Sequence, residues 1–494
     1  MGWWQSGSFR RIASAFALAA VSSPVALPTH AEDWIFTPAA TLAVTATDNA
    51  DGAPKGLEES DLIISPTASL GVLGRGARVQ LNLNYAISRD EFVKTKNDDF
   101  RQNLLGFGRV ELWEDQLFLE SEASISLATI NDAGAITTGT RVQQDNQTQV
   151  TNFRISPVFR HHFGSWADSE SRYRLSRAAF SQDNNQTGGT PSNSVTHSLT
   201  QNVNSGPNFG RLLWSINTLT EVTDRADQSD PFKRSRAALS TEYVITRQIS
   251  ALNSLGYEQI EDPSLNNTQA PDGLFWTVGA RWRPGPRTDI RAEFGHRFRA
   301  PFWNGSASYR VAEGTTVRVS YDQSVETNQT AINDRLSFIG EDALGNIIDV
   351  RTGLPINPND PAFDLTDQDE VFLRRALNMS LSGVSGRASY SLVAFYSERE
   401  GQPSGQTETS LGGTATFGWQ LSRLTALSLQ SSYRSQSPST GTDEQTVNVR
   451  LALNYTLTDS VSGSTTYSHL RRMSDNPTDQ LQENAISFSL RKAF

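Results

Sequence analysis

The stretch AISFSLRKAF, residues 485–494, determines the structural class of this chain. Its apolar side chains occupy one parity and its polar side chains the other, with Ile486, Phe488, Leu490 and Phe494 against Ser487, Ser489 and Arg491. Successive side chains of a β-strand point to opposite faces, so this alternation predicts a strand with one apolar face and one wet face. A water-soluble protein has no evident use for such a strand at its very end.

The same alternation recurs along most of the chain. It is clearest at 79–87, 117–127, 274–283 and 447–457. These segments run for roughly 10 to 14 residues, whereas strands of globular proteins average about 5 or 6, and a tilted strand needs about 9 to 11 to cross a bilayer. Their length therefore favours a membrane β-barrel over a secreted solenoid, sandwich or propeller.

The connections between these segments alternate in length. Tight turns are expected at 74–76, 114–116, 246–248, 283–287, 312–315, 383–386, 421–423 and 457–460. Longer polar loops are expected at 48–58, 89–100, 130–146, 180–192, 222–233, 258–273, 326–370, 397–405, 434–443 and 471–483. Short periplasmic turns and long extracellular loops are typical of outer-membrane barrels. We therefore predict an all-β, antiparallel transmembrane barrel of about 22 strands (20–22), with both termini in the periplasm.

Aromatic residues gather near the ends of the predicted strands, as they do in the girdles at both membrane interfaces. The examples are Trp34, Trp113, Tyr257, Trp276, Trp282, Trp303 and Tyr433. In a barrel the opening stretch becomes the closing strand. Its final ring, Phe494, is similar to the C-terminal signature by which such barrels are recognised for insertion, although Lys492 stands where that signature usually has an apolar side chain.

The N-terminus predicts export. Arg10 and Arg11 precede an apolar run from residue 12 to 21, and small residues stand before Glu32. A membrane anchor is the alternative, but the run of about 10 residues is half the length that a spanning helix needs. We expect a signal peptide at 1–31 and one barrel domain over 32–494. Because the first strand begins soon after Glu32, we expect no plug domain.

Composition excludes several classes of function. The net charge of −10 argues against a nucleic-acid partner, and the absence of cysteine excludes disulfides and thiolate sites. The six histidines form no HExxH, and there is no GxSxG. We expect no enzyme, no catalytic residues, no cofactor and no dedicated metal site.

Arginines gather on the polar parity of the strands between 274 and 321. They are Arg281, Arg283, Arg291, Arg297, Arg299, Arg310 and Arg318. Arg154, Arg160, Arg172 and Arg174 form a second basic group. Guanidinium rows in a pore attract anions, so the first group is our candidate for contact with an anionic solute or polymer. The alternative is that these arginines pair with acids on neighbouring strands.

The loop 326–370 is the longest connection, and it carries about ten acidic residues. Loops of this length are usually functional or disordered. Folded inward, it would constrict the lumen. Pointing outward, it could collect Ca²⁺ through Asp364, Asp367, Asp369 and Glu370, or it could be a solvated acidic surface.

The block WIFTPAATLAVTATDNADG (34–52) and the later GLFWTVGARWRPGPRTDIRAEFGHRF (273–298) resemble a family of proteobacterial barrels, the PEP-CTERM-system-associated family. SDLIISPTASLGVLGRGARVQLNLNYAISRDEF (60–92) and TRQISALNSLGYEQIED (246–262) extend the resemblance over most of the chain. Genes of that family tend to lie beside exopolysaccharide-assembly and exosortase genes. The resemblance implies a role in exopolysaccharide export, and it carries over no functional residues.

The sequence therefore predicts a porin-like conduit for exopolysaccharide in the bacterial outer membrane. A diffusion porin that prefers anions is the first alternative, and a non-conducting surface-binding or structural barrel is the second. The expected partners are lipid and lipopolysaccharide, the barrel assembly machinery through the strand ending at Phe494, exopolysaccharide and periplasmic export components.

Overall fold

The fold was analysed in a computed structural model of the chain. It describes residues 33–95, 99–129, 147–181, 192–226, 229–265, 271–327, 329–331, 339–341, 347–349, 354–355, 371–402, 404–438 and 441–494. The expected signal peptide lies outside the described residues. No helix within these ranges is both long and apolar enough to cross a membrane.

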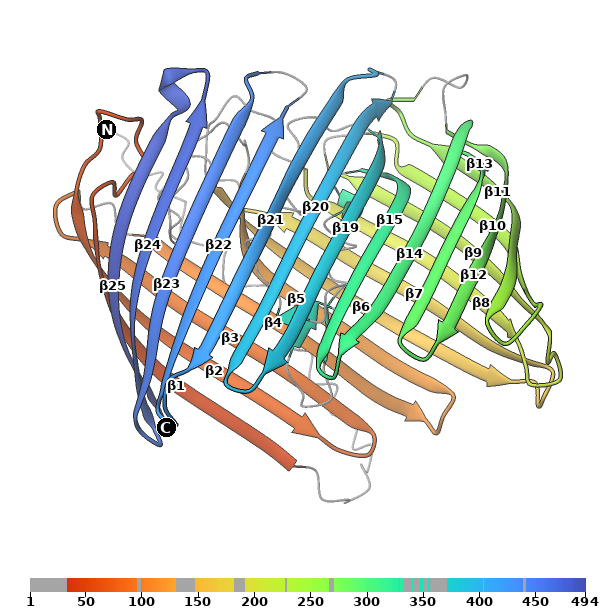
Figure 1. The fold of residues 1–494 in the computed structure, drawn as a ribbon, viewed down its shortest axis with the longest axis horizontal. Helices are drawn as coiled ribbons and strands as arrows, with labels where there is room; N and C mark the ends of the chain where they lie inside the picture. Colours follow the sequence, from red (N-terminus) through yellow and green to blue (C-terminus); the bar gives the residue numbers. More distant parts are fainter. Residues whose placement is uncertain are drawn as a thin grey trace, which may run out of the picture.

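The chain forms a closed barrel of 22 strands in which each strand pairs antiparallel with the next (Figure 1). The first eleven are β1 (Asp33–Thr47), β2 (Asp61–Arg75), β3 (Val79–Phe92), β4 (Asp99–Trp113), β5 (Leu117–Thr129), β6 (Gln147–His162), β7 (Ala167–Phe180), β8 (Ser194–Ser205), β9 (Leu212–Arg225), β10 (Phe232–Val244) and β11 (Ile249–Glu261). The others are β12 (Gly273–Gly285), β13 (Thr288–Arg297), β14 (Ala300–Ala312), β15 (Thr315–Glu326), β19 (Val371–Ser385), β20 (Ala388–Gln402), β21 (Thr407–Gln420), β22 (Thr425–Ser437), β23 (Glu444–Thr458), β24 (Val461–Ser474) and β25 (Leu481–Ala493). The predicted class and strand number are confirmed.

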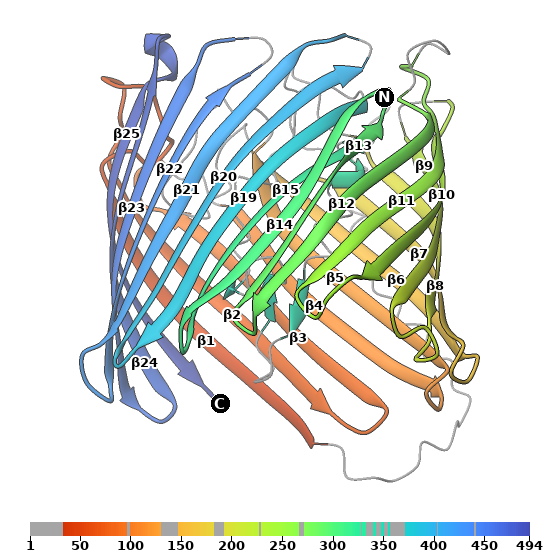
Figure 2. The ribbon, with the colours of Figure 1, turned by 45° about the vertical axis from the view of Figure 1, so that its right-hand side comes forward.

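The amphipathic stretch at 485–494 closes the barrel. Strand β25 pairs with β1 from Ala39 opposite Ala493 to Thr47 opposite Ala485. The backbone N–H of Phe494 donates to the carbonyl of Pro38 at 3.0 Å. The C-terminus lies at the end of the barrel that carries the tight turns (Figures 1 and 2).

One connection at the loop end departs from the expected alternation. Strands β13 and β14 are joined by only Phe298 and Arg299, whose φ angles are 56° and 58°. Two successive left-handed residues match the type I′ hairpin turn. The usual Asn-Gly signal is missing here, so the sequence pattern did not reveal the turn.

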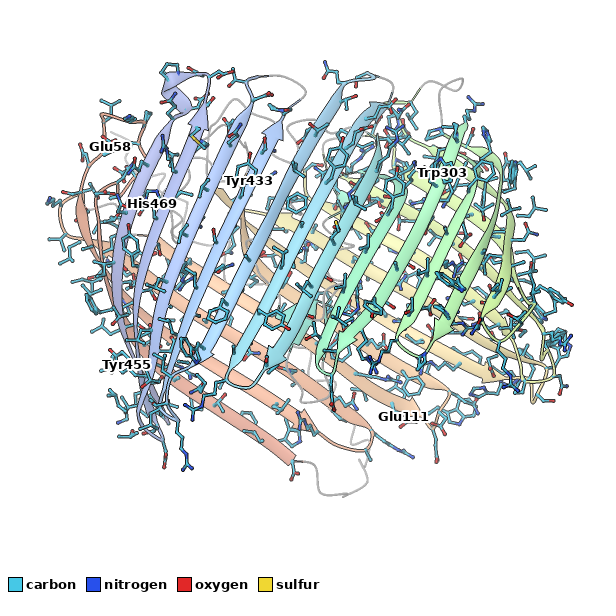
Figure 3. All side chains as sticks on the ribbon, in the orientation of Figure 1. Glu58, Glu111, Trp303, Tyr433, Tyr455 and His469 are labelled. Carbon is cyan, nitrogen blue, oxygen red and sulfur yellow. The ribbon has the colours of Figure 1, made fainter. Side chains whose placement is uncertain are left out.

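The outer surface of the barrel is an apolar band with aromatic ends. Large apolar side chains of the outward parity are exposed, and Trp303 and Tyr433 lie toward the loop end while Tyr455 lies toward the turn end (Figure 3). The residues expected at the girdles are all exposed, from Trp276 at 40% to Trp113 at 60%. A surface of this kind suits hydrocarbon flanked by two interfaces.

Aromatic rings cover glycines on the neighbouring strand. Trp34 stands opposite Gly74, and Tyr455 stands opposite Gly463. A Cβ on Gly463 would lie 2.4 Å from the Tyr455 ring, so the absence of a side chain lets the ring lie flat on the partner strand. Such pairs shield backbone and help to set the register.

A small apolar cluster lies at the loop end of the barrel, where β10 and β11 approach β14, β15 and β19. Its members are Phe232, Ile260, Phe298, Phe302, Val325, Val371 and Leu373. Val325 and Val371 flank the long connection between β15 and β19 on either side. The cluster therefore anchors both ends of that loop.

Candidate functional site

The lumen wall is the candidate functional site, and its arginines alternate with the exposed apolar residues of β12 to β15. Five of the seven arginines named from the sequence form ion pairs. Arg281 Nε lies 3.0 Å from Asp289, and Arg291 lies 2.6 Å from Glu293. On these strands carboxylates of the same strand or of nearby strands thus neutralise most of the guanidinium charge.

Arg297 and Arg299 do not stand in the open wall. Arg297 lies 2.8 Å from Glu258 and above the rings of Phe298 and Phe302, where its side chain is 13% exposed. The placement expected for Arg299 is wrong, because Arg299 belongs to the β13–β14 turn at the rim, 3.8 Å from Asp272. The short turn ends the wall two residues earlier than the parity pattern indicates.

Arg310 and Arg318 differ from the other five. Both side chains are exposed on the polar parity, and neither forms an ion pair within the described part of the chain. Arg310 stands opposite Thr316, and Arg318 stands between Ser308 and Ser380 on the neighbouring strands. Their charge is therefore available to a solute.

Arg450 on β23 shares this environment, although it was not among the predicted site residues. It is exposed, it forms no ion pair with any described residue, and its neighbours across the sheet are Gln430 and Ser468. Its parity alone, between outward-facing Val449 and Leu451, would have placed it in the lumen. We call Arg310, Arg318 and Arg450 together the unpaired set.

The second basic group, on β6 and β7, is mostly neutralised. Arg154 lies 3.1 Å from Glu122, and Arg160 lies 2.9 Å from Glu170. Arg172 pairs with both Glu120 and Glu170. Pairing with acids was the alternative reading of these arginines, and it describes this part of the wall.

The wall formed by β21 to β25 and β1 is lined at mid-height by small polar side chains. They include Thr414, Thr416, Ser428, Gln430, Ser432, Asn448, Ser464, Thr466, Ser487, Ser489 and Thr45. Ser464 and Ser489 lie 2.7 Å apart, and Thr45 donates to Ser487 at 3.0 Å. Hydroxyl groups both donate and accept, so this surface can exchange hydrogen bonds with a moving polar chain.

Ion pairs hold the base of the long loop between β15 and β19. Glu326 Oε1 lies 3.4 Å from Arg399 and 3.7 Å from Arg374, whose Nη1 also lies 3.4 Å from Asp322. Thr327, the first residue beyond β15, is fully buried. The predicted cation contacts Asp364, Asp367, Asp369 and Glu370 lie outside the described residues.

Part of this loop forms a three-stranded antiparallel sheet of β16 (Ile339–Glu341), β17 (Ile347–Asp349) and β18 (Leu354–Pro355). Both ribbon views draw the strands of this small sheet within the outline of the barrel (Figures 1 and 2). Among the described residues no group of three or more His, Asp or Glu is arranged to hold a metal ion.

Acidic residues that were not among the predicted site residues organise the wall. Glu258 on β11 lies 2.6 Å from Arg234 and 2.8 Å from Arg297, and its side chain is 2% exposed. Glu242 on β10 lies within 3.7 Å of both Arg281 and Arg283. Both acids share the inward parity, but only the register of the strands shows which arginines they meet.

Solved structures resemble the chain, whereas no family model and no curated protein matches it. The siderophore receptor PirA from Acinetobacter baumannii has a TM-score of 0.50 at 8% identity, covering 92% of this chain and 80% of the receptor. The ferric-catecholate import receptor Fiu from E. coli K12 has a TM-score of 0.50 at 9% identity, covering 93% and 82%. At these identities the likeness shows the fold alone. The chain has the fold of an outer-membrane β-barrel, and its exposed apolar band suits that membrane.

Proposed function

We propose that the barrel is a conduit across the outer membrane for an anionic, hydroxyl-rich polymer, with exopolysaccharide as the cargo. The observation that carries the proposal is the unpaired set. Arg310, Arg318 and Arg450 are exposed to the lumen, and each stands opposite Ser, Thr or Gln on the adjacent strands. Guanidinium groups attract anions, and hydroxyl neighbours hold a sugar chain weakly enough to release it.

The loop 326–370 supplies the gate in this proposal. Barrels near 22 strands enclose a wide lumen, which must be narrowed if the membrane is to stay sealed. The ion pairs of Glu326 and the apolar cluster fix the loop at both ends, and the small sheet β16–β18 is drawn within the outline of the barrel (Figure 2).

The proposal extends to cellular context. The resemblance to the PEP-CTERM-associated barrels supports an exosortase-linked envelope system with periplasmic export components. We also propose that the signal peptide 1–31 is removed on export, and that β25, ending at Phe494, is recognised by the barrel assembly machinery. Lipid and lipopolysaccharide would cover the apolar band.

The first prediction concerns charge selectivity. We expect the refolded barrel to pass anions preferentially in a planar bilayer under a KCl gradient. The triple variant Arg310→Gln, Arg318→Gln, Arg450→Gln should move the reversal potential most of the way to that of an unselective pore, because these guanidinium charges have no carboxylate partner among the residues that the structure describes. Arg471→Gln is the control, since Arg471 is exposed on the outward parity beside Val447 and should leave selectivity unchanged. An unaltered reversal potential in the triple variant would refute the role of the unpaired set.

The second prediction concerns the gate. Replacing residues 328–370 by a Gly-Ser-Gly linker should raise the single-channel conductance by roughly tenfold. In this proposal the loop narrows the lumen, and a 22-stranded barrel without that loop has a wide lumen. This replacement keeps Glu326 and its ion pairs. The same linker in place of residues 131–145, in the β5–β6 loop, is the control. A constitutive anion current in the unmodified barrel, unchanged by the replacement, would favour a diffusion porin. If neither the unmodified barrel nor the variant lacking residues 328–370 conducts, a structural barrel would be favoured.

A further inference from the structure

A cavity of about 650 Å³ opens at the turn end of the lumen, next to β3, β4, β5 and β6. We call it the vestibule, and it is lined by Arg78, Gln80, Arg109, Glu111, Phe118 and Arg160, among others. Glu111 lies toward the end that carries the tight turns (Figure 3). If those turns face the periplasm, as in other outer-membrane barrels, the vestibule is the first part of the lumen that a periplasmic molecule meets.

The guanidinium group of Arg109 is held in position in the vestibule, but it has no carboxylate partner among the described residues. The guanidinium carbon of Arg109 lies 4.2 Å from the centre of the Phe118 ring, and that of Arg160 lies 5.1 Å from it. Arg160 is paired with Glu170 at 2.9 Å, whereas Arg109 forms no ion pair with a described residue. A guanidinium that rests on a ring keeps the N–H donors at its edge free, and their fork matches the two oxygens of a carboxylate.

The other lining groups point to hydroxyls rather than to further anions. Glu111 Oε1 already accepts the backbone N–H of Asp115 at 2.5 Å, and the carboxylate retains lone pairs for other donors. Gln80 is exposed and offers both an acceptor and two donors. Glu111 and Asp115 repel a densely charged polyphosphate more strongly than a sugar with one carboxylate per ring, and the hydroxyls of that sugar can donate to the same two carboxylates.

We propose that the vestibule is a binding subsite for a carboxylated saccharide of the uronate type, in which Arg109 holds the carboxylate and Gln80 and Glu111 receive ring hydroxyls. The volume is in the range of small-ligand pockets, which hold roughly 300–1,000 Å³, and it accommodates a short oligosaccharide. The idea that exported chains enter the lumen here rests on the proposed function, whereas binding in the vestibule can be measured without it.

The test is calorimetric titration of the full, refolded barrel in detergent with a trimer of galacturonic acid. We expect the trimer to bind, and neutral maltotriose to bind at least tenfold more weakly. Arg109→Gln should weaken binding of the trimer by about 10- to 100-fold, the usual effect of losing charge-assisted hydrogen bonds to a carboxylate. The control Arg471→Gln removes an exposed arginine on the outward parity of β24, away from the lumen, and should keep the affinity of the unmodified barrel.

Equal affinity of Arg109→Gln and the unmodified barrel would overturn the proposal, as would equal binding of maltotriose or no binding of the trimer by the unmodified barrel. The heat-dependent mobility of the folded barrel in gel electrophoresis confirms that each variant has folded. Binding of the trimer by a barrel that never conducts would refute the conduit but keep the vestibule. Anion conduction without binding of the trimer would refute the vestibule as a binding subsite but keep the conduit.

Discussion

Replacing Glu258 by alanine is expected to lower the free energy of unfolding by about 3–5 kcal/mol, the usual cost of removing one partner from a buried ion pair. Glu258 stands between two guanidinium groups, with Arg234 at 2.6 Å and Arg297 at 2.8 Å. Its side chain is 2% exposed, and those of the two arginines are 15% and 13% exposed. Without the carboxylate, two cations would face each other in a space that water barely reaches.

We call Glu258, Arg234 and Arg297 the triad. The groups around the triad limit any rearrangement that could reduce this loss of stability. Arg297 lies 4.5 Å from the centre of the Phe298 ring and 4.9 Å from that of Phe275. Arg234 donates to the carbonyl of Val325, which belongs to β15, five places farther around the barrel. Because Val325 precedes the long loop, the Glu258→Ala variant should also conduct less steadily, with frequent partial openings.

The control for this variant lies three residues along the same strand. Glu261 pairs with Lys233 at 3.5 Å on the exposed outer rim, where both side chains are about half exposed. Exposed pairs contribute about 0.2–1 kcal/mol, so Glu261→Ala should leave the midpoint of unfolding in guanidinium chloride nearly unchanged. A small, equal shift in both variants would show that the triad is hydrated. Replacing Glu258, Arg234 and Arg297 together by leucine should recover most of the stability, because none of the three replaced positions then carries a buried charge without its partner.

How much of this fold can be predicted from the sequence depends on whether a feature is set by neighbouring residues or by residues that are far apart in the chain. Strand number, closure and the girdles follow from alternation and loop length, which are local properties of strands that meet two solvents. The pairing of Arg297 with Glu258 is not local, because β12 lies between their strands and the barrel must curve to bring them together. The turn at Phe298 and Arg299 was missed for a different reason, since neither residue type commonly adopts a positive φ.

The same distinction applies to the lumen. Parity assigns Arg310 and Arg318 to the wet face, and the same reasoning assigns Arg450 to it as well. It could not separate these from Arg281 or Arg291, because an arginine with a carboxylate opposite and one with a serine opposite have the same local pattern. The difference is set by strand register, which decides whether lumen charge is neutralised or available.

The last prediction tests the assignment of the two faces of β25. Phe488→Arg should destabilise the barrel in phosphatidylcholine vesicles by about 2–4 kcal/mol, the cost of an arginine facing lipid near the middle of the bilayer. Phe488 is 53% exposed on the outward parity, near the middle of the strand, and it stands opposite Val44 and Thr465. Unfolding in denaturant, measured at equilibrium in the vesicles, gives the change in free energy.

The neighbouring residue provides the matched control. Ser487 accepts a hydrogen bond from Thr45 and stands opposite Thr466 on the hydroxyl-lined wall, so an arginine there reaches water in the lumen. Ser487→Arg should therefore cost less than about 1 kcal/mol, since lumen substitutions mainly change selectivity, and it should increase the preference for anions. Equal destabilisation by both variants would contradict the membrane-facing role of the apolar parity. A large difference between two adjacent positions follows only from a strand with lipid on one side and water on the other.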